Sequence, residues 1–535
     1  MSETSKKQSF LHGAALLALA TAVVKVIGAF YKIPLKMVIG DQGYGYFITA
    51  YDVYNVLLLI ATAGLPVAMS RMISQASAMG HSNQVRRVYK TARAIFLALG
   101  LMSSLFMVLG SRWLAEKVLM QPNAAYAIAC LGPCALFMGI ISTFRGFFQG
   151  HGNMRPTSAS QVLEAAVKLA IGLGLAFFLM RMFQNVPVAV AGAVLGVTVS
   201  CAVSAVFLYS KFRPAYRTLP ESDDTPLSFK ATAKGLLAIA VPITIGSAGL
   251  QFLVVVEQRI YMGQLMNVCG YSQAAADTMK GIYSMAMTIY NMPCAFIVPI
   301  SISVIPAIAS QLTLKNHTVV RETEESAARV AGLISMPCAV GLCLLARPIM
   351  ALLGGYSGEN LELAAKLMTF LGICVFLYAN IQYTNALLQA HGYAYVPVIN
   401  MLLAGVCKLV VVYFLSGNPS LGIMGAPIGS VLSYSAIATM NLLSIRRLVP
   451  QKPKLLQNMI RPALPALLMG VVVALTYWGL TRILGQDGSR VLLCGIPIAV
   501  GAAVYFGGIV LFKTITREDC LLLPKGEKIA KLLRL

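Results

Sequence analysis

Runs of apolar residues, each about 20 residues long, follow one another along almost the whole chain and are separated by short polar segments. A helix of that length crosses a bilayer core of roughly 30 Å. The pattern therefore predicts about fourteen membrane-spanning helices. Their approximate centres are Ala22, Leu58, Leu101, Leu136, Ile171, Val199, Gly246, Cys294, Val340, Val375, Leu409, Ser433, Val472 and Val500.

The architecture that these runs predict is an all-α helical bundle. They are too long and too apolar for the strands of a membrane β-barrel, and lipid tolerates neither exposed loops nor open sheet edges. Composition agrees, because 58% of the 535 residues are hydrophobic and only 11% are charged. The first run has a basic start but is too long for a signal peptide and carries Lys25, so we expect a retained first helix.

Positive charge is concentrated in alternate loops. The loops after the second, sixth and twelfth runs are basic, whereas others, such as 416–422, lack Lys and Arg. The positive-inside rule then places both termini in the cytoplasm. The net charge of +23 follows from this rule and from attraction to anionic lipid, and no soluble basic domain is present to bind nucleic acid.

The sequence contains an internal repeat. "FFQGHGNMRP" at 147–156 and "LLQAHGYAYVP" at 387–397 place Gln149 over Gln389 and His151 over His391, each 240 residues apart, and Lys168 over Lys408 at the same spacing. One half of the bundle is thus a copy of the other, and an even number of spans gives both halves the same orientation. We expect the QxHG corner to turn the chain and to expose its polar groups to water.

Charged residues inside the apolar runs mark a candidate binding cavity between the two halves. Each costs on the order of 2.5–3.5 kcal/mol at the membrane centre, so such residues face a wet cavity or a partner. The candidate substrate-binding residues are Lys25, Lys32, Lys168, Arg259, Lys408, Asn55 and Asn291. Glu164 and Glu257 are candidates for ion coupling or charge pairing, and Glu164 could pair with Lys168 four residues on.

The sign of these charges favours an anionic substrate, because cations outnumber carboxylates, and phosphate is a good ligand for them. Neither the eleven cysteines nor the five histidines have the spacing of a metal site, and we expect no cofactor beyond coupling to Na⁺, H⁺ or the membrane potential. Helix-bending positions are candidate hinges, namely Gly64, Pro66, Pro242 and Pro299.

Five segments in order give the chain a family resemblance: "KVIGAFYKIPL", "GDQGYGYFITAYDVYNVLLLIATAGLPVAMSRMIS", "RGFFQGHGNMRPTSASQVLEAAVKL", "YNMPCAFIVPISISVIPAIA" and "TREDCLLLPKGEKI". They resemble the SpoVB-type branch of the multidrug/oligosaccharidyl-lipid/polysaccharide (MOP) exporter superfamily, which is related to the MurJ-type lipid II flippases. The resemblance covers essentially the whole chain.

The resemblance implies a V-shaped fold of two six-helix lobes, at 1–225 and 226–450, with a central cationic cavity. Two further helices at 451–513 would form a groove for a polyprenyl tail, and 514–535 would be a cytoplasmic amphipathic tail. Lys25 matches the first basic residue of the flippases' opening helix, and Lys32 lies next to the second. Lipid II flippases carry one arginine where this chain has Leu58 and Leu59, and a second where it has Thr288, and the two missing arginines argue against lipid II itself as the substrate.

The resulting hypothesis is a flippase, not an enzyme, that moves an undecaprenyl-diphosphate-linked oligosaccharide or peptidoglycan precursor across the membrane by alternating access. Its expected partners are that lipid-linked saccharide, membrane lipids and cell-wall synthesis proteins. Two alternatives stay open: a cation-coupled multidrug or metabolite antiporter of the same superfamily, and a non-transporting scaffold for envelope or spore assembly. A membrane glycosyltransferase is disfavoured, because the loops are short and poor in Asp and His.

Overall fold

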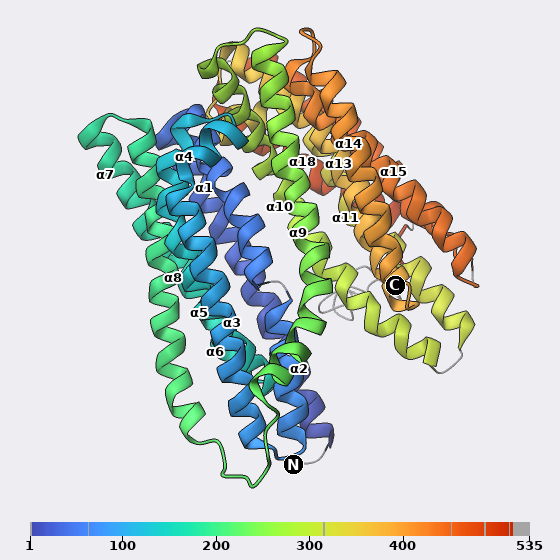
Figure 1. The fold of residues 1–535 in the computed structure, drawn as a ribbon. Coiled ribbons are helices and arrows are strands. Elements are labelled where there is room, and N and C mark those ends of the chain that lie inside the picture. Colours follow the sequence, from blue (N-terminus) through green and yellow to red (C-terminus); the bar gives the residue numbers. More distant parts are fainter. Residues whose placement is uncertain are drawn as a thin grey trace. The chain divides into compact units, whose positions relative to one another are not determined.

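A computed structural model describes residues 3–62, 64–313, 316–450, 452–485, 488–512 and 514–516, and side chains from residue 20 onward apart from scattered positions. Within these ranges every regular element is a helix, which confirms the predicted all-α fold (Figure 1). The predicted amphipathic tail lies outside the described residues from 517 onward.

The chain divides into two compact units, Met1–Gly281 and Ile282–Leu535. The boundary falls inside a helix, so that α9 and the first turns of α10 pack with unit 1, although the sequence repeat assigns them to the second half. The lobe boundary near residue 225 describes where the sequence repeat begins again, and it stays a prediction.

Unit 1 is built from the helices that precede this boundary. They are α1 (Glu3–Thr62), α2 (Leu65–Ala78), α3 (Ser82–Leu109), α4 (Ser111–Trp113), η1 (Leu114–Val118), η2 (Pro122–Ala124), α5 (Ala125–Gly150), α6 (Arg155–Val167), η3 (Lys168–Gly172), α7 (Leu173–Phe183), α8 (Val186–Arg217), α9 (Phe229–Asn267) and the start of α10 (Gln273–Thr313).

Unit 2 continues with the rest of α10 and the helices after it. They are α11 (His317–Leu344), α12 (Ala346–Leu353), α13 (Gly358–Ala390), α14 (Tyr395–Ser416), η4 (Gly422–Met424), α15 (Gly425–Leu448), α16 (Leu455–Ile460), α17 (Ala463–Leu484) and α18 (Arg490–Leu511).

Twelve helical segments in the described ranges are long and apolar enough to cross a membrane, and the chain is a multi-pass membrane protein. The predicted number of fourteen is not confirmed. One of the twelve, Phe30–Ala78, has 49 residues, and it contains Gly40, whose φ of 70° and ψ of −174° interrupt the helix. Glycine takes this conformation without a steric penalty, so the chain can reverse there between the first two predicted runs.

The two copies of the QxHG corner have the same backbone structure. Gly152 and Gly392 both have positive φ, 72° and 86°, and the amide of the next residue donates to a carbonyl five positions back, Asn153 to Phe148 at 2.9 Å and Tyr393 to Leu388 at 2.8 Å. This is the glycine-dependent ending of a helix, which agrees with a structural role for the repeated glycines.

A close helix contact surrounds the predicted hinge at Gly64. The chain leaves helical structure between α1 and α2, and Pro66 lies in the first turn of α2. A Cβ at Gly64 would lie 2.1 Å from the carbonyl oxygen of Ala240 on α9, so only glycine fits. Pro242 and Pro299 lie inside α9 and α10, and their side chains are outside the described set.

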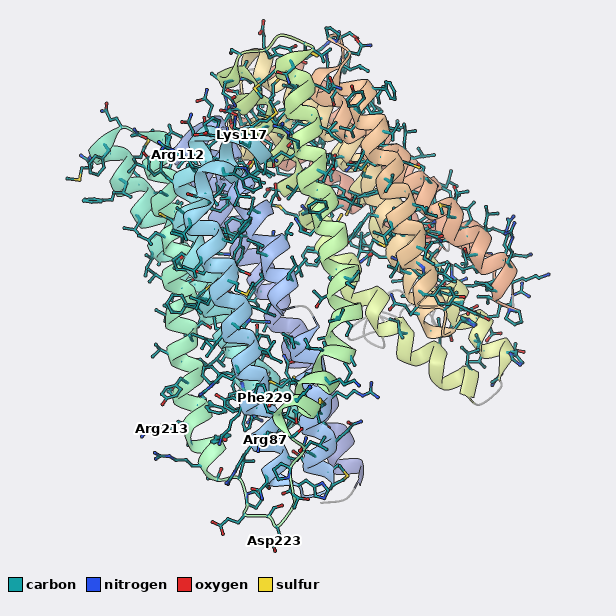
Figure 2. All side chains as sticks on the ribbon, in the orientation of Figure 1. Arg87, Arg112, Lys117, Arg213, Asp223 and Phe229 are labelled. Carbon is teal, nitrogen blue, oxygen red and sulfur yellow. The ribbon has the colours of Figure 1, made fainter. Side chains whose placement is uncertain are left out.

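The basic ends of α3 and α8 are tied together by the loop at 218–228. In Figure 2, Arg87, Arg213 and Asp223 lie at one end of unit 1, whereas Arg112 and Lys117 lie at the other. Asp224 in this loop accepts hydrogen bonds from the backbone amides of Asn83 at 2.9 Å and Gln84 at 2.8 Å, at the start of α3.

We predict that Gly64→Ala destabilises unit 1 by about 1–3 kcal/mol, because the added methyl overpacks the contact with α9. Thermal unfolding of the purified protein measures the effect. Gly174→Ala on α7, where a Cβ meets nothing within 4 Å, is the control and should unfold like the wild type. Equal stability of both variants would contradict this packing.

We also predict that acid loosens the loop at 218–228. Desolvation raises the pKa of Asp224, but hydrogen bonds from Ser222, Asn83 and Gln84 outweigh it and hold the pKa below its ordinary 3.8. Because the folded-state pKa is the lower one, the carboxylate stabilises the docked loop above 3.8, and this is lost as the pH falls through the folded-state value. Limited proteolysis across this range should show faster cleavage in acid, and Asp224→Asn should cleave at a rate independent of pH.

Candidate functional site

The structure places the predicted binding residues in both units. Unit 1 holds Lys32 and Asn55 on α1, Lys168 at the start of η3 and Arg259 on α9, whereas unit 2 holds Asn291 on α10 and Lys408 on α14. Lys25 lies in α1, but its side chain is outside the described set. Asn55 and Lys408 are half-buried, and Arg259 and Asn291 are exposed.

Lys32 and Lys168 come together inside unit 1. Both side chains are half-buried, and Lys32 lies close enough to Lys168 and to Asp52 to interact with their charges. The Lys168 Nζ lies 5.6 Å from the ring centroid of Tyr31, a cation–π contact. Among the side chains that the structure describes, no carboxylate lies within ion-pairing distance of either lysine.

Small residues and a widened helical turn build this site. Gly196 on α8 packs so closely on η3 that a Cβ there would lie 2.3 Å from the Cα of Gly172. The buried Tyr31 fills the adjoining space and donates to the carbonyl of Ala193 on α8 at 3.1 Å. Lys168 opens the π-helical turn η3, a feature frequent at functional sites. Its repeat partner Lys408 lies in the regular helix α14 instead.

A second group of charges lies between α1, α9 and α10 within unit 1. Lys280 is buried and pairs with Asp52 at 3.5 Å, and it donates to the Oε1 of Gln258 at 3.2 Å. Glu257 is also buried and interacts electrostatically with both members of the pair. Sequence analysis missed Asp52 and Lys280, although a charge within an apolar run is the signal that identified the others.

A network of buried polar side chains continues from this pair toward the end of unit 1 that holds η2. Asp277 at the start of α10 accepts hydrogen bonds at 2.9 Å from Tyr46 on α1, from Gln121 beside η2 and from Gln273. Gln258 donates to Thr49 at 3.0 Å, and Thr49 donates to Gln121. The network joins helices of the first sequence repeat to α9 and α10 of the second.

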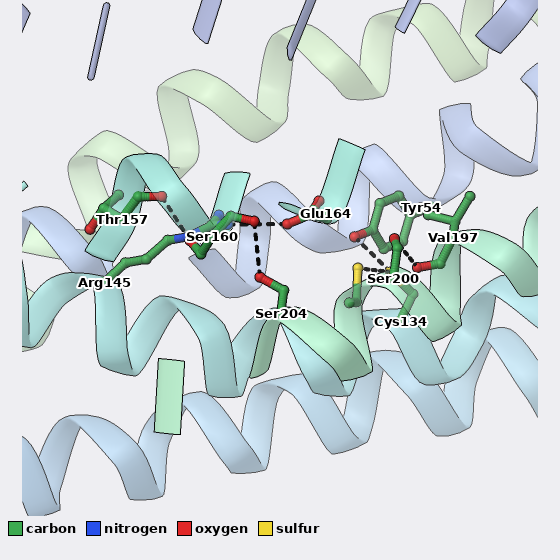
Figure 3. Close-up of polar contacts among 10 residues, drawn as sticks. Tyr54, Cys134, Arg145, Thr157, Ser160, Glu164, Val197, Ser200 and Ser204 are labelled. Atoms are coloured by element: carbon green, nitrogen blue, oxygen red, sulfur yellow. Dashed lines mark hydrogen bonds and ion pairs between the residues drawn. The ribbon is translucent and has the colours of Figure 1, made fainter. Parts of the chain in front are cut away.

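Glu164 is paired, but not with the predicted partner. Arg145 on α5 contacts its Oε2 at 3.1 Å and donates to Ser160 at 3.1 Å (Figure 3). The expected pair with Lys168 does not form, because η3 begins at that lysine and its amine lies over Tyr31. Glu164 therefore neutralises a cation that sequence analysis did not single out.

An apolar groove lies between α1 and the α6–α7 segment. Lys32 and Lys168 are not among its lining residues, which are Ile27, Pro34, Val38, Ala166, Leu169, Ala170, Leu173, Gly174 and Phe177. The helical segments that bear Lys32 and Lys168 thus also border an apolar surface. Within the described ranges no group of three or more His, Cys, Asp or Glu side chains is placed to hold a metal ion.

The described helices define a multi-span helical membrane protein, and solved structures share its fold. The lipid II flippase MurJ in an inward closed conformation matches with a TM-score of 0.68 at 14% identity, over 93% of this chain and 98% of that one. An inward-facing MATE-family multidrug transporter of the MOP superfamily matches with a TM-score of 0.64 at 16% identity, over 81% of this chain and 99% of that one. At these identities the likeness concerns the fold.

The sequence profile of the polysaccharide biosynthesis protein family matches residues 10–312, and the MatE profile matches residues 275–414. The chain belongs to the polysaccharide biosynthesis protein family. Its relatives in Bacillus subtilis include stage V sporulation protein B, 25% identical over 97% of this chain and 98% of that one, and the lipid II flippase MurJ, 24% identical over 92% and 94%. The resemblance seen in the sequence is confirmed.

We predict that the Arg145–Glu164 pair is structural. Glu164→Gln and Arg145→Met should each destabilise the protein by up to about 3 kcal/mol, less than a fully buried pair, because the side chains are 13% and 26% exposed. The double variant should lose less than the sum of the two, since neither charge is then left alone. Thermal unfolding of the four proteins measures the coupling, and strictly additive losses would show that the contact contributes nothing.

Proposed function

We propose that this exporter moves a lipid-linked saccharide with an anionic diphosphate headgroup, of the undecaprenyl-diphosphate class, across the bacterial cytoplasmic membrane. Both termini lie in the cytoplasm, so the headgroup enters from the cytoplasmic leaflet and leaves on the other side. The lipid chain stays in the bilayer while the headgroup crosses. The observation that carries the proposal is the half-buried pair of lysines, Lys32 and Lys168, with no carboxylate in ion-pairing distance among the described side chains.

Two like charges held together inside an apolar bundle repel each other, and an anion between them removes that cost. A diphosphate carries enough charge and enough oxygen acceptors to satisfy both ammonium groups. Lys25 belongs to the same proposal, on the strength of its position on α1. The names of the relatives, a lipid II flippase and a sporulation protein, support a cell-envelope substrate without specifying it.

A cationic substrate is less well supported, because two of the carboxylates within the apolar runs already form ion pairs with basic side chains. Asp52 pairs with Lys280, and Glu164 pairs with Arg145. A drug antiporter would need such a group to release its cation and bind cargo. The apolar groove beside the lysine-bearing helices suits a ligand with a charged head and an apolar tail.

The proposal predicts that Lys32→Ala and Lys168→Ala each slow the movement of a fluorescent undecaprenyl-diphosphate saccharide between leaflets of reconstituted vesicles by about 10- to 100-fold, since a charge-assisted hydrogen bond contributes about 1.5–3 kcal/mol. Lys117→Ala, which removes an exposed cation outside this site, is the matched control and should keep the wild-type rate.

Three results would argue against it. Wild-type rates in both lysine variants would remove the binding assignment. Export of a cationic dye that depends on Glu257, with no lipid movement, would favour the antiporter. A well-folded wild type that moves neither substrate would favour the scaffold.

A further inference from the structure

The two copies of the QxHG corner share their backbone but differ in what the histidine contacts. His151 is exposed, and its Nδ1 lies 2.9 Å from the carbonyl oxygen of Phe147, one turn back in its own helix. His391 instead lies with its side chain only 5% exposed, and its Nε2 contacts the Oε1 of Glu324 on α11 at 2.6 Å. The expectation that the corner at 147–156 exposes its polar groups to water therefore holds for His151, whereas His391 in the repeat copy is enclosed.

The carboxylate that His391 meets is fully enclosed. Glu324 has no exposed surface, and the hydroxyl of Tyr383 on α13 donates to its backbone carbonyl. Its second oxygen, Oε2, is buried and has no hydrogen-bond partner in the described part of the chain. A buried carboxylate oxygen without a partner is costly, unless the group carries a proton or shares one.

The other charged and titratable groups around the pair have contacts of their own. On α11, Glu325 accepts from Arg321 at 3.1 Å and from the backbone amide of Lys454 before α16, and Arg329 donates to Asn458 on α16 at 2.9 Å. On α13 the nearby group is Tyr383. Among the described side chains, His391 is thus the titratable group that contacts the Glu324 carboxylate.

Charge counting links proton binding at this pair to its burial. With one proton shared along the 2.6 Å contact, the pair is neutral overall. Removing the proton leaves a net negative charge in the closed site, and adding a second proton leaves a net positive charge. Either net charge raises the free energy of the closed site, because no water is there to solvate it. When the corner separates from α11, water enters and hydrates the two side chains. Hydration stabilises the charged forms, so the proton can leave.

We propose that Glu324 and His391 form a proton-binding site, and that release of its proton is coupled to separation of the α13 corner from α11. The site lies at the end of unit 2 where α11 begins, α13 ends and the basic segment 446–454 connects α15 to α16. In the proposed orientation that end faces the cytoplasm, so the proton exchanges with the cytoplasm. Our assignment of this site to energy coupling rests on the proposed transport function, but the site itself does not.

Hydrogen exchange on the full-length protein tests the site without any substrate. Above the ordinary histidine pKa of about 6.5, opening the pair to water releases its one proton, so the opening equilibrium at residues 388–394 should rise about tenfold per pH unit there, after correction for the intrinsic pH dependence of amide exchange. The matching corner at 148–154 in the same molecule is an internal control and should show no such slope, because His151 contacts a carbonyl of its own helix and, among the described side chains, pairs with no carboxylate.

The variants separate the pair from a general effect of pH. The double variant Glu324→Gln/His391→Gln keeps a neutral hydrogen-bonding pair, so the protein should fold. In this variant the opening equilibrium at 388–394 should no longer depend on pH. Glu325→Gln, at the neighbouring carboxylate, should keep that dependence. Equal slopes at both corners of the wild type, or an unchanged slope in the double variant, would overturn the proposal.

A separate measurement addresses coupling. In vesicles that move the lipid-linked saccharide, an imposed pH gradient should accelerate the wild type and leave the double variant unaffected. If exchange shows the proton site but lipid does not move even in the wild type, the proposed cargo is wrong and the proton site stands.

Discussion

A charge enclosed in an apolar helical bundle must be paired, hydrogen-bonded or matched by a ligand, and this constraint organises the whole protein. Asp52 with Lys280 and Arg145 with Glu164 meet it internally. Asp277 meets it with three hydrogen bonds. Lys32 and Lys168 have no carboxylate within ion-pairing distance among the described side chains. On the proposed function, the anionic headgroup of the substrate would match these two charges.

The architecture could be read from the sequence because hydrophobic length and charge asymmetry are local properties. Long apolar runs require helices, and the 240-residue spacing of Gln149 and Gln389 shows in the matching corners at Gly152 and Gly392. The number of spans stays a prediction, because the runs centred at Ala22 and Leu58 lie in one helix interrupted at Gly40, and twelve described segments are long and apolar enough to cross a membrane.

The site could be predicted only in part, because partners come from distant segments. Lys32, Lys168, Glu164 and Glu257 are visible as charges in apolar runs, but their spacing does not show that Glu164 meets Arg145 or that Lys168 lies over Tyr31. A helical i,i+4 rule assumes a regular helix, and η3 breaks it at Lys168. The internal repeat also does not predict the surroundings of His391. This residue contacts the buried Glu324, whereas its repeat counterpart His151 contacts a carbonyl of its own helix.

The most direct test of the central claim is an experimental structure of the protein with undecaprenyl diphosphate bound. The account predicts phosphate oxygens at about 2.7–2.9 Å from the ammonium nitrogens of Lys32 and Lys168, with Asp52 still on Lys280. A diphosphate held elsewhere, with these two lysines turned to carboxylates, would contradict it.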